Sequence, residues 1–142
     1  MNFPFLEEIV SLNRDQIQQF GGWQATSDNL EHPQSLEWVL DAIQYTLYGV
    51  SLYPHLAGKA GILAWTIITR HVFFDGSKRT AMATLIYFLG LNGYQLDVTQ
   101  DEIIETSLKI AEGHKANSYT LEEFVKWIQG HLVDEVREAE EH

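Results

Sequence analysis

The sequence contains no cysteine, only three prolines, and only nine lysine and arginine side chains against twenty acids. Without cysteine the chain can hold neither a disulfide framework nor a thiolate metal site or nucleophile.

The formal net charge of -11 repels the backbone of DNA and RNA, so we expect no direct nucleic-acid binding. No apolar run approaches the ~20 residues of a membrane span, and Glu7 and Glu8 stand where a signal peptide would be basic. We therefore expect a cytoplasmic protein without a membrane segment.

The composition and length are those of a folded domain. Apolar residues make up 45% of the 142 residues, and that much apolar surface can offset the entropy of ordering the chain. The sequence has no internal repeat and no long linker rich in proline, glycine or serine. We therefore expect a single domain over residues 1–142, with an acidic tail at about residues 134–142 that frays.

Hydrophobic periodicity predicts helices along most of the chain. Apolar residues recur at helical spacing over residues 6–20, 36–48, 56–68 and 82–89. Gly49 is expected to end the second of these helices, residues 50–53 to form a short connection, and Pro54 to open the third helix.

Two capping boxes predict the starts of two further helices. Thr99 pairs with Glu102, and Thr120 pairs with Glu123, in the spacing that satisfies backbone donors at a helix start. No strand pattern exceeds about four residues, which is below the usual strand length of ~5–6 residues. The pattern indicates an all-α protein.

The segment HVFFDGSKR, residues 71–79, separates the two most apolar helices and lacks their periodicity. It contains the turn dipeptide Asp-Gly, so we expect a loop over residues 72–78 and a helix that resumes at Arg79 or Thr80. Three of the nine basic side chains fall within residues 70–79, which contain a single acid. On an acidic protein, this stretch predicts a local anion site.

The residue types of this loop suit a nucleotide phosphate. Backbone N–H groups at a helix start converge on an anion, and Gly76 lets that backbone approach closely. Lys78 and Arg79 add full charges. His71 can take up a proton near neutral pH as a general base, and Asp75, the only carboxylate of the loop, is the candidate Mg²⁺ ligand. Taken singly, His71 would be a partner of the helix dipole and Asp75 a turn residue, but their combination favours a site.

Six residues of this loop resemble the signature of the Fic/Doc family, which reads H-x-F-x-D/N-G/A-N-K-R in its Doc, or death-on-curing, branch. They are His71, Phe73, Asp75, Gly76, Lys78 and Arg79. The segments LYPHLAGKAG, residues 52–61, and LIYFLGLNGYQLD, residues 85–97, are also similar to Doc-type sequences. The resemblance implies a compact all-α helical bundle with the loop between two central buried helices.

The resemblance also implies a role for each residue. The catalytic residues are His71 as base, Asp75 as the Mg²⁺ ligand, Lys78 and Arg79. The residues that bind ATP are Phe73, Gly76, Ser77, Lys78 and Arg79. Phe73 is expected to anchor the loop by burial, which leaves Phe74 to cover the substrate groove.

Lys78 is similar to the Doc branch, since typical Fic members carry glycine there and transfer AMP. The resemblance implies a protein kinase that moves the terminal phosphate of ATP to a threonine of elongation factor Tu. It further implies the toxin of a toxin–antitoxin pair, inhibited in trans by its antitoxin partner. A Fic-type AMP transferase with the same fold is the alternative.

Two residues depart from the signature. Val72 replaces a common proline, which removes no functional group. Ser77 replaces an asparagine that contacts a nucleotide phosphate in the family, and serine is shorter. We expect weakened catalysis and hence a faster reaction in Ser77→Asn. The alternative of another class is a binding module in which Ser77 marks the decay of activity.

Overall fold

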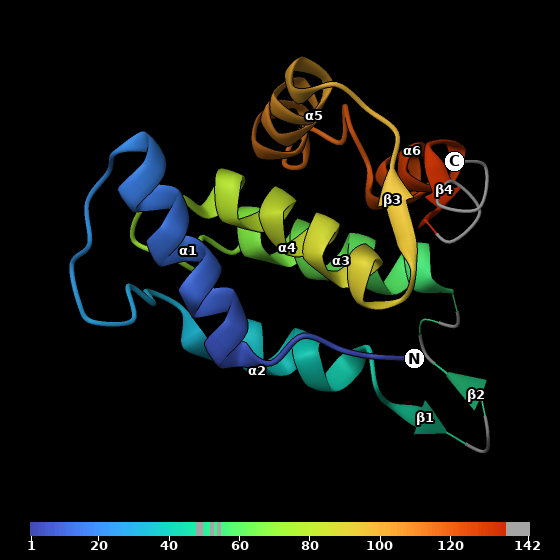
Figure 1. The fold of residues 1–142 in the computed structure, drawn as a ribbon, viewed down its shortest axis with the longest axis horizontal. Helices are drawn as coiled ribbons and strands as arrows, with labels where there is room; N and C mark the ends of the chain where they lie inside the picture. The colour runs from blue at the N-terminus through green and yellow to red at the C-terminus, as the bar shows by residue number, and fades with distance from the viewer. Residues whose placement is uncertain (48–49, 52, 54, 136–142) are drawn as a thin grey trace.

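The computed structural model describes residues 1–47, 50–51, 53 and 55–135. This part of the chain is mostly helical (Figure 1). Its helices are α1 (Leu6–Phe20), α2 (Pro33–Ala42), α3 (Leu56–Thr69), α4 (Ser77–Leu91), α5 (Gln100–Gly113) and α6 (Leu121–Gly130). Its strands form two antiparallel pairs, β1 (Thr46–Leu47) with β2 (Val50–Ser51) and β3 (Tyr94–Leu96) with β4 (Leu132–Asp134). The expectation of an all-α fold is confirmed.

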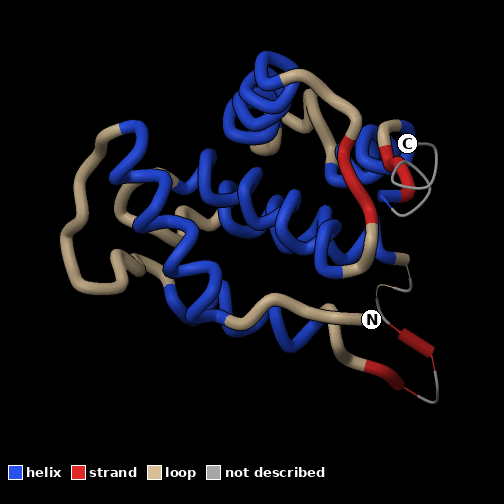
Figure 2. Tube along the Cα trace, viewed as in Figure 1, coloured by secondary structure: helices blue, strands red, loops and turns tan. Residues whose placement is uncertain are grey.

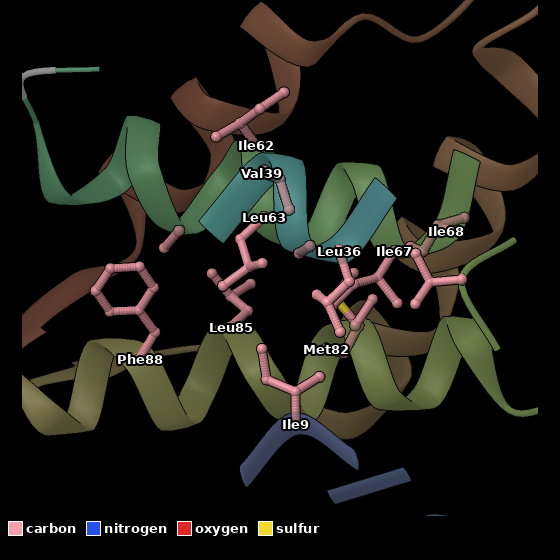
Figure 3. Packing of buried hydrophobic residues seen from close by; sticks show 14 of the residues in the cluster. Ile9, Leu36, Val39, Ile62, Leu63, Ile67, Ile68, Met82, Leu85 and Phe88 are labelled. Carbon is pink, nitrogen blue, oxygen red and sulfur yellow. The ribbon is translucent and has the colours of Figure 1, made fainter. Parts of the chain in front are cut away.

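The helices α3 and α4 lie side by side at the centre of the molecule (Figure 1). Ten of the fourteen residues of α3 are buried, which explains why its sequence is apolar almost all round. Leu63 and Ile67 of α3 meet Leu85 and Phe88 of α4 in the core, all with an exposure of 1% or less (Figure 3). Burying a side chain of this size stabilises the fold by ~1.5–3 kcal/mol. The turn that joins the two helices is therefore fixed at both ends by helices that are packed in the core.

The first two helices pack against this central pair. α1 packs on α4 and α2 packs on α3, and Ile9 and Leu36 point from them into the core (Figure 3). Figure 2 shows the long loop between α1 and α2, residues 21–32, at the same end of the molecule as the turn between α3 and α4. Leu30 of this loop forms a β-bridge with Phe73 of the turn. The loop and the turn are thus direct neighbours.

The last two helices begin where the capping boxes predict. The Thr99 hydroxyl accepts a hydrogen bond from Glu102 N at 3.2 Å, and the Thr120 hydroxyl accepts one from Glu123 N at 3.2 Å. A cap of this kind is worth ~1 kcal/mol. α5 packs against both central helices and α6 against α3. In the described part of the chain, no helix combines the length and apolar character that a membrane span requires.

The second helix ends earlier than its apolar spacing predicts. The prediction ran to Gly49, whereas α2 ends at Ala42. The buried Lys59 of α3 donates from Nζ to the carbonyl oxygen of Ile43, directly after the helix, and burial lowers the pKa of Lys59. This ammonium group satisfies a carbonyl that a further helical turn would otherwise use. Gly49 itself, and Pro54 as the predicted start of the third helix, lie outside the described residues.

Two smaller expectations also change. The predicted connection at residues 50–53 contains strand β2, which pairs with β1. The start of the acidic tail is ordered: Asp134 ends β4, and Glu135 N donates to Gly93 O at 3.0 Å. The rest of the tail, residues 136–142, lies outside the described residues, so its expected fraying stays a prediction.

Candidate active site

The turn between α3 and α4 starts with a strained residue. α3 ends at Thr69, and His71 lies in the left-handed backbone region with a φ of 49°. Few non-glycine residues adopt this conformation, and such strain concentrates at functional sites. The His71 side chain is exposed, and its ring makes no hydrogen bond to any described residue. The imidazole is therefore available to a bound molecule.

The residues after His71 fix the turn in the core. Val72 and Phe73 are 0% and 2% exposed, whereas Phe74 is 38% exposed. This burial agrees with the expectation that Phe73 points inward. Glu31 N of the α1–α2 loop donates to Val72 O at 2.8 Å, and the Trp23 ring meets the Phe74 ring edge-on at 6.0 Å. The α1–α2 loop thus supports the turn along its length.

Helix α4 begins two or three residues earlier than predicted. Gly76, in the left-handed region with a φ of 78°, takes the N-cap position, and Thr80 N donates to Gly76 O at 2.8 Å. Because glycine adopts this conformation without strain, the helix can start directly after the turn. Residues 77–79 form the first helical turn, and their N–H groups have no partner among the described residues. Free N–H groups at a helix start are an anion-binding arrangement.

The Ser77 side chain is bound to the turn itself. Its hydroxyl accepts a hydrogen bond from Phe73 N at 3.1 Å and lies 3.3 Å from Phe73 O, to which it can donate. The hydroxyl is therefore occupied within the turn, at the position where the family signature has an asparagine amide. The structure instead leaves the backbone N–H of Ser77 as its available donor.

Both carboxylate oxygens of Asp75 accept backbone hydrogen bonds. Oδ2 accepts from Trp23 N at 2.7 Å, and Oδ1 accepts from Gly76 N at 2.8 Å. Gly22 makes the first contact possible, because a Cβ at this position would lie 2.8 Å from Asp75 Oδ2. The pair Gly21-Gly22 directly follows α1, whose C-cap is Gly21. Its second glycine also lets the α1–α2 loop reach the carboxylate.

The donor set around Asp75 fits a single Mg²⁺ ion. Each carboxylate oxygen has two lone pairs, so each keeps one acceptor site beside its backbone hydrogen bond. Carboxylate oxygen is the hard ligand that Mg²⁺ prefers, usually with phosphate oxygens and water. Among the described residues there is no group of three His, Asp or Glu side chains that could form a cage of protein ligands. An ion at Asp75 would therefore depend on a phosphate ligand.

The cationic side chains of the turn are exposed. Lys78 and Arg79 form no salt bridge with any described residue. The Arg79 guanidinium lies 5.4 Å from the centre of the Phe20 ring and 3.5 Å from Gly21 O. Arg70, grouped with these cations in the sequence, lines a different hollow beside Trp38. The predicted anion site would therefore depend on Lys78 and Arg79, without Arg70.

One open cavity of about 460 Å³ collects the predicted site residues. All seven, His71, Phe73, Asp75, Gly76, Ser77, Lys78 and Arg79, line it. The opposite wall comes from α5, through Ile104, Ser107, Leu108 and Ala111. Sequence reasoning missed this wall. The available signal in the sequence was the spacing of Ile104 and Leu108, which lie one helical turn apart. In the structure their side chains are 49% and 40% exposed.

A second hollow, of about 330 Å³, adjoins this cavity. The two hollows share Lys78, Arg79, Ile104 and Ser107. The second continues past these residues toward Phe20 at the end of α1. The exposed cations therefore stand where two open spaces meet.

Two comparisons with known proteins find relatives of this chain. Residues 3–89 match the model of the Fic/DOC family, and this range includes the whole turn at residues 71–79. A stretch of 53 residues is 47% identical to the protein named Toxin Doc from Mycolicibacterium smegmatis (strain ATCC 700084 / mc(2)155). That stretch is 37% of this chain and 41% of the toxin's length, so it covers less than half of either protein. Since the family match extends over more than half of the sequence, the chain belongs to the Fic/DOC family.

Proposed function

We propose that this protein is a Doc-type phosphotransferase that moves the terminal phosphate of ATP to a protein hydroxyl. One observation carries the proposal. A single cavity is lined by the free imidazole of His71, the Asp75 carboxylate and the exposed charges of Lys78 and Arg79 beside the free N–H groups of a helix start. These are the groups that proton removal and phosphate binding require.

In this proposal, the start of α4 binds the phosphates. The N–H groups of residues 77–79 donate to phosphate oxygens, and the helix dipole adds partial positive charge. Lys78 and Arg79 offset the remaining negative charge. Asp75 would hold Mg²⁺, which neutralises phosphate charge when it is bound.

His71 then accepts the proton of the attacking hydroxyl. The hydroxyl oxygen forms a bond to the terminal phosphorus, the bond from that phosphorus to the bridging oxygen breaks, and the electron pair leaves with ADP. A positioned base of this kind contributes typically ~10²–10⁴-fold to the rate.

Our proposal for the partners draws on the resemblance to the Doc branch and on the named relative. We propose a threonine of elongation factor Tu as the substrate, which places the reaction in the cytoplasm. The similarity to Toxin Doc supports a toxin whose antitoxin partner inhibits it in trans. Lys78, which matches the Doc branch of the family signature, supports phosphate transfer over AMP transfer.

The test is the intact mass of purified elongation factor Tu after incubation with the protein, ATP and Mg²⁺. We expect a gain of one phosphate, and a rate that falls by ~10²-fold or more in His71→Ala. His55→Ala is the matched control, because His55 is an exposed histidine at the opposite end of α3. Its rate should equal that of the wild type.

Other outcomes distinguish the alternatives. A gain of AMP on the target supports a nucleotidyl transferase with the same fold. An unchanged mass, together with no ATP binding in calorimetry, supports a non-catalytic binding module. Equal phosphate transfer by His71→Ala and the wild type excludes His71 as the base.

A further inference from the structure

Two buried asparagines meet beneath the turn that carries the site. Asn13 of α1 and Asn29 of the α1–α2 loop are each 1% exposed. Asn29 Nδ2 donates to Asn13 Oδ1 at 3.1 Å. Both amide nitrogens also donate to the same carbonyl oxygen, that of Asp75, at 2.9 Å from Asn13 and 3.3 Å from Asn29. A carbonyl oxygen has two lone pairs, so this pair of donors saturates it.

Each asparagine is itself held in place. Asn13 Nδ2 also donates to the hydroxyl of the buried Thr80 at 3.0 Å. Asn29 Oδ1 accepts from Ala25 N at 2.9 Å, and Asn29 N donates to the Thr26 hydroxyl at 2.9 Å. Buried side-chain networks of this kind fix one geometry when every member has its partners. The two amides therefore form a rigid clamp on the Asp75 carbonyl.

The backbone of the same loop follows the turn. Phe74 N donates to Asn29 O at 3.0 Å, and His32 N donates to Val72 O at 3.1 Å. Asn29 adopts a left-handed conformation with a φ of 58°. The clamp is thus accompanied by backbone hydrogen bonds that join the loop to the turn on the C-terminal side of Asn29.

The direction of one peptide group links this clamp to the site. In a trans peptide the C=O and N–H groups point in opposite directions. Because the Asp75 carbonyl is held inward by the two asparagines, the Gly76 N–H must point away from them, and it donates to Asp75 Oδ1 at 2.8 Å. Glycine tolerates both signs of φ, so residue 76 itself offers little resistance to a flip of this peptide. A flipped peptide would turn a carbonyl oxygen toward the cavity and would repel an anion.

We propose that Asn13 and Asn29 are positioning residues that hold the Asp75–Gly76 peptide in the orientation that suits a phosphate ligand. The identity of the ligand as a phosphate depends on the proposed function, whereas the orientation of the peptide follows from the hydrogen bonds of the two asparagines. Through this peptide the clamp fixes the direction of the Asp75 carboxylate and the start of α4. A merely structural pair of asparagines would change stability on removal and leave the phosphate affinity of the folded protein unchanged.

The first test variant is Asn29→Gly, which keeps the left-handed backbone accessible and removes only the amide. Asn117→Gly is the matched control, because Asn117 has the same φ of 58° and is exposed, outside the site. Both changes are made in a His71→Ala background, which prevents turnover, and ATP binding with Mg²⁺ is measured by calorimetry. We expect Asn29→Gly to weaken binding roughly tenfold, and Asn117→Gly to leave it unchanged.

The second readout needs no ligand. The backbone ¹⁵N–H signal of Gly76, recorded without nucleotide, should move or double in Asn29→Gly and stay fixed in Asn117→Gly. Asn29→Asp supplies an independent variant, because it keeps an acceptor for Ala25 N and loses the donor to the Asp75 carbonyl. We expect the same two effects from it.

The outcomes separate the clamp from the proposed function. Unchanged ATP affinity with an unmoved Gly76 signal in both Asn29 variants overturns the proposal. If even the His71→Ala parent binds no ATP, the proposed function fails and the Gly76 signal alone decides. A displaced signal then supports the clamp, and an unmoved one refutes it.

Discussion

The Ser77 hydroxyl sits where the family signature has asparagine, and it serves both backbone groups of Phe73. The faster reaction of Ser77→Asn stays a prediction. In that variant the asparagine amide would have to reach a phosphate and also replace the two hydrogen bonds that the Ser77 hydroxyl makes to Phe73. In Ser77→Ala the Phe73 N–H loses its partner, and leaving such a group unsatisfied costs ~1–3 kcal/mol. We predict a loss of at least about 1 kcal/mol in the free energy of unfolding, measured by chemical denaturation.

Ser11→Ala is the control for that experiment. Ser11 is exposed on α1, so the same exchange there should be neutral, or stabilising by up to about 0.5 kcal/mol through helix propensity. Equal stability of Ser77→Ala and the wild type would show that the hydroxyl does not hold the turn.

At the scale of helices, the contact between α3 and α6 depends on a glycine. A Cβ at Gly61 would lie 2.9 Å from Val125 Cγ2 and 3.4 Å from Ile128 Cδ1. Gly58, on the same helix, has no atom within 4 Å of the equivalent position. We predict that Gly61→Ala destabilises the fold by about 1–3 kcal/mol through overpacking. Gly58→Ala should stabilise it by about 0.5–1 kcal/mol, because it lowers the entropy of the unfolded chain.

Thermal or chemical unfolding of the two variants measures this contrast. Both variants replace glycine with alanine in α3, so the change in helix propensity is the same. The difference between their free energies of unfolding therefore reports how closely α3 and α6 pack. If Gly61→Ala were as stable as Gly58→Ala, the two helices would not be packed as closely as the structure has them.

The helices could be predicted where their bounds depend on nearby residues in the sequence. They could not be predicted where the bounds depend on contacts with another part of the fold or on the backbone conformation of one residue. α3 and α4 could be predicted from the sequence alone, because α3 is apolar almost all round and α4 carries its buried apolar residues at helical spacing. The end of α2 was misplaced because Lys59, which binds the carbonyl after it, lies in another helix. The start of α4 was misplaced because the conformation of Gly76 decides it.

The site divides in the same way. His71 and Gly76 could be identified because they are neighbours in one short segment of recognisable chemistry. Asn13, Asn29 and Gly22 could not, because they reach Asp75 only through folding and their residue types are common at helix ends and in loops. A single sequence therefore predicted the candidate reactive groups and left out the residues from other elements that contact Asp75.

Over the whole molecule, we expect ATP binding to depend on where the positive charges lie and less on the net charge of -11. Lys78→Gln and Lys109→Gln each change the formal net charge from -11 to -12. Lys78 stands exposed at the cavity without an ion pair to any described residue, whereas Lys109 pairs with Glu105 at 3.9 Å. We predict that Lys78→Gln weakens ATP binding in calorimetry by roughly tenfold, and that Lys109→Gln changes it by less than about twofold. Equal losses in both variants would assign the effect to the overall field of the protein.

In the proposed function, the turn between α3 and α4 receives one triphosphate at the start of α4. The most direct test is a titration of ¹⁵N-labelled protein with ATP and Mg²⁺, followed through its backbone amide signals. We expect the largest changes on residues 76–79 and on His71, with smaller ones on the facing residues of α5. Signals of the turn that stay fixed at saturating ATP, or changes that gather elsewhere on the molecule, would contradict it.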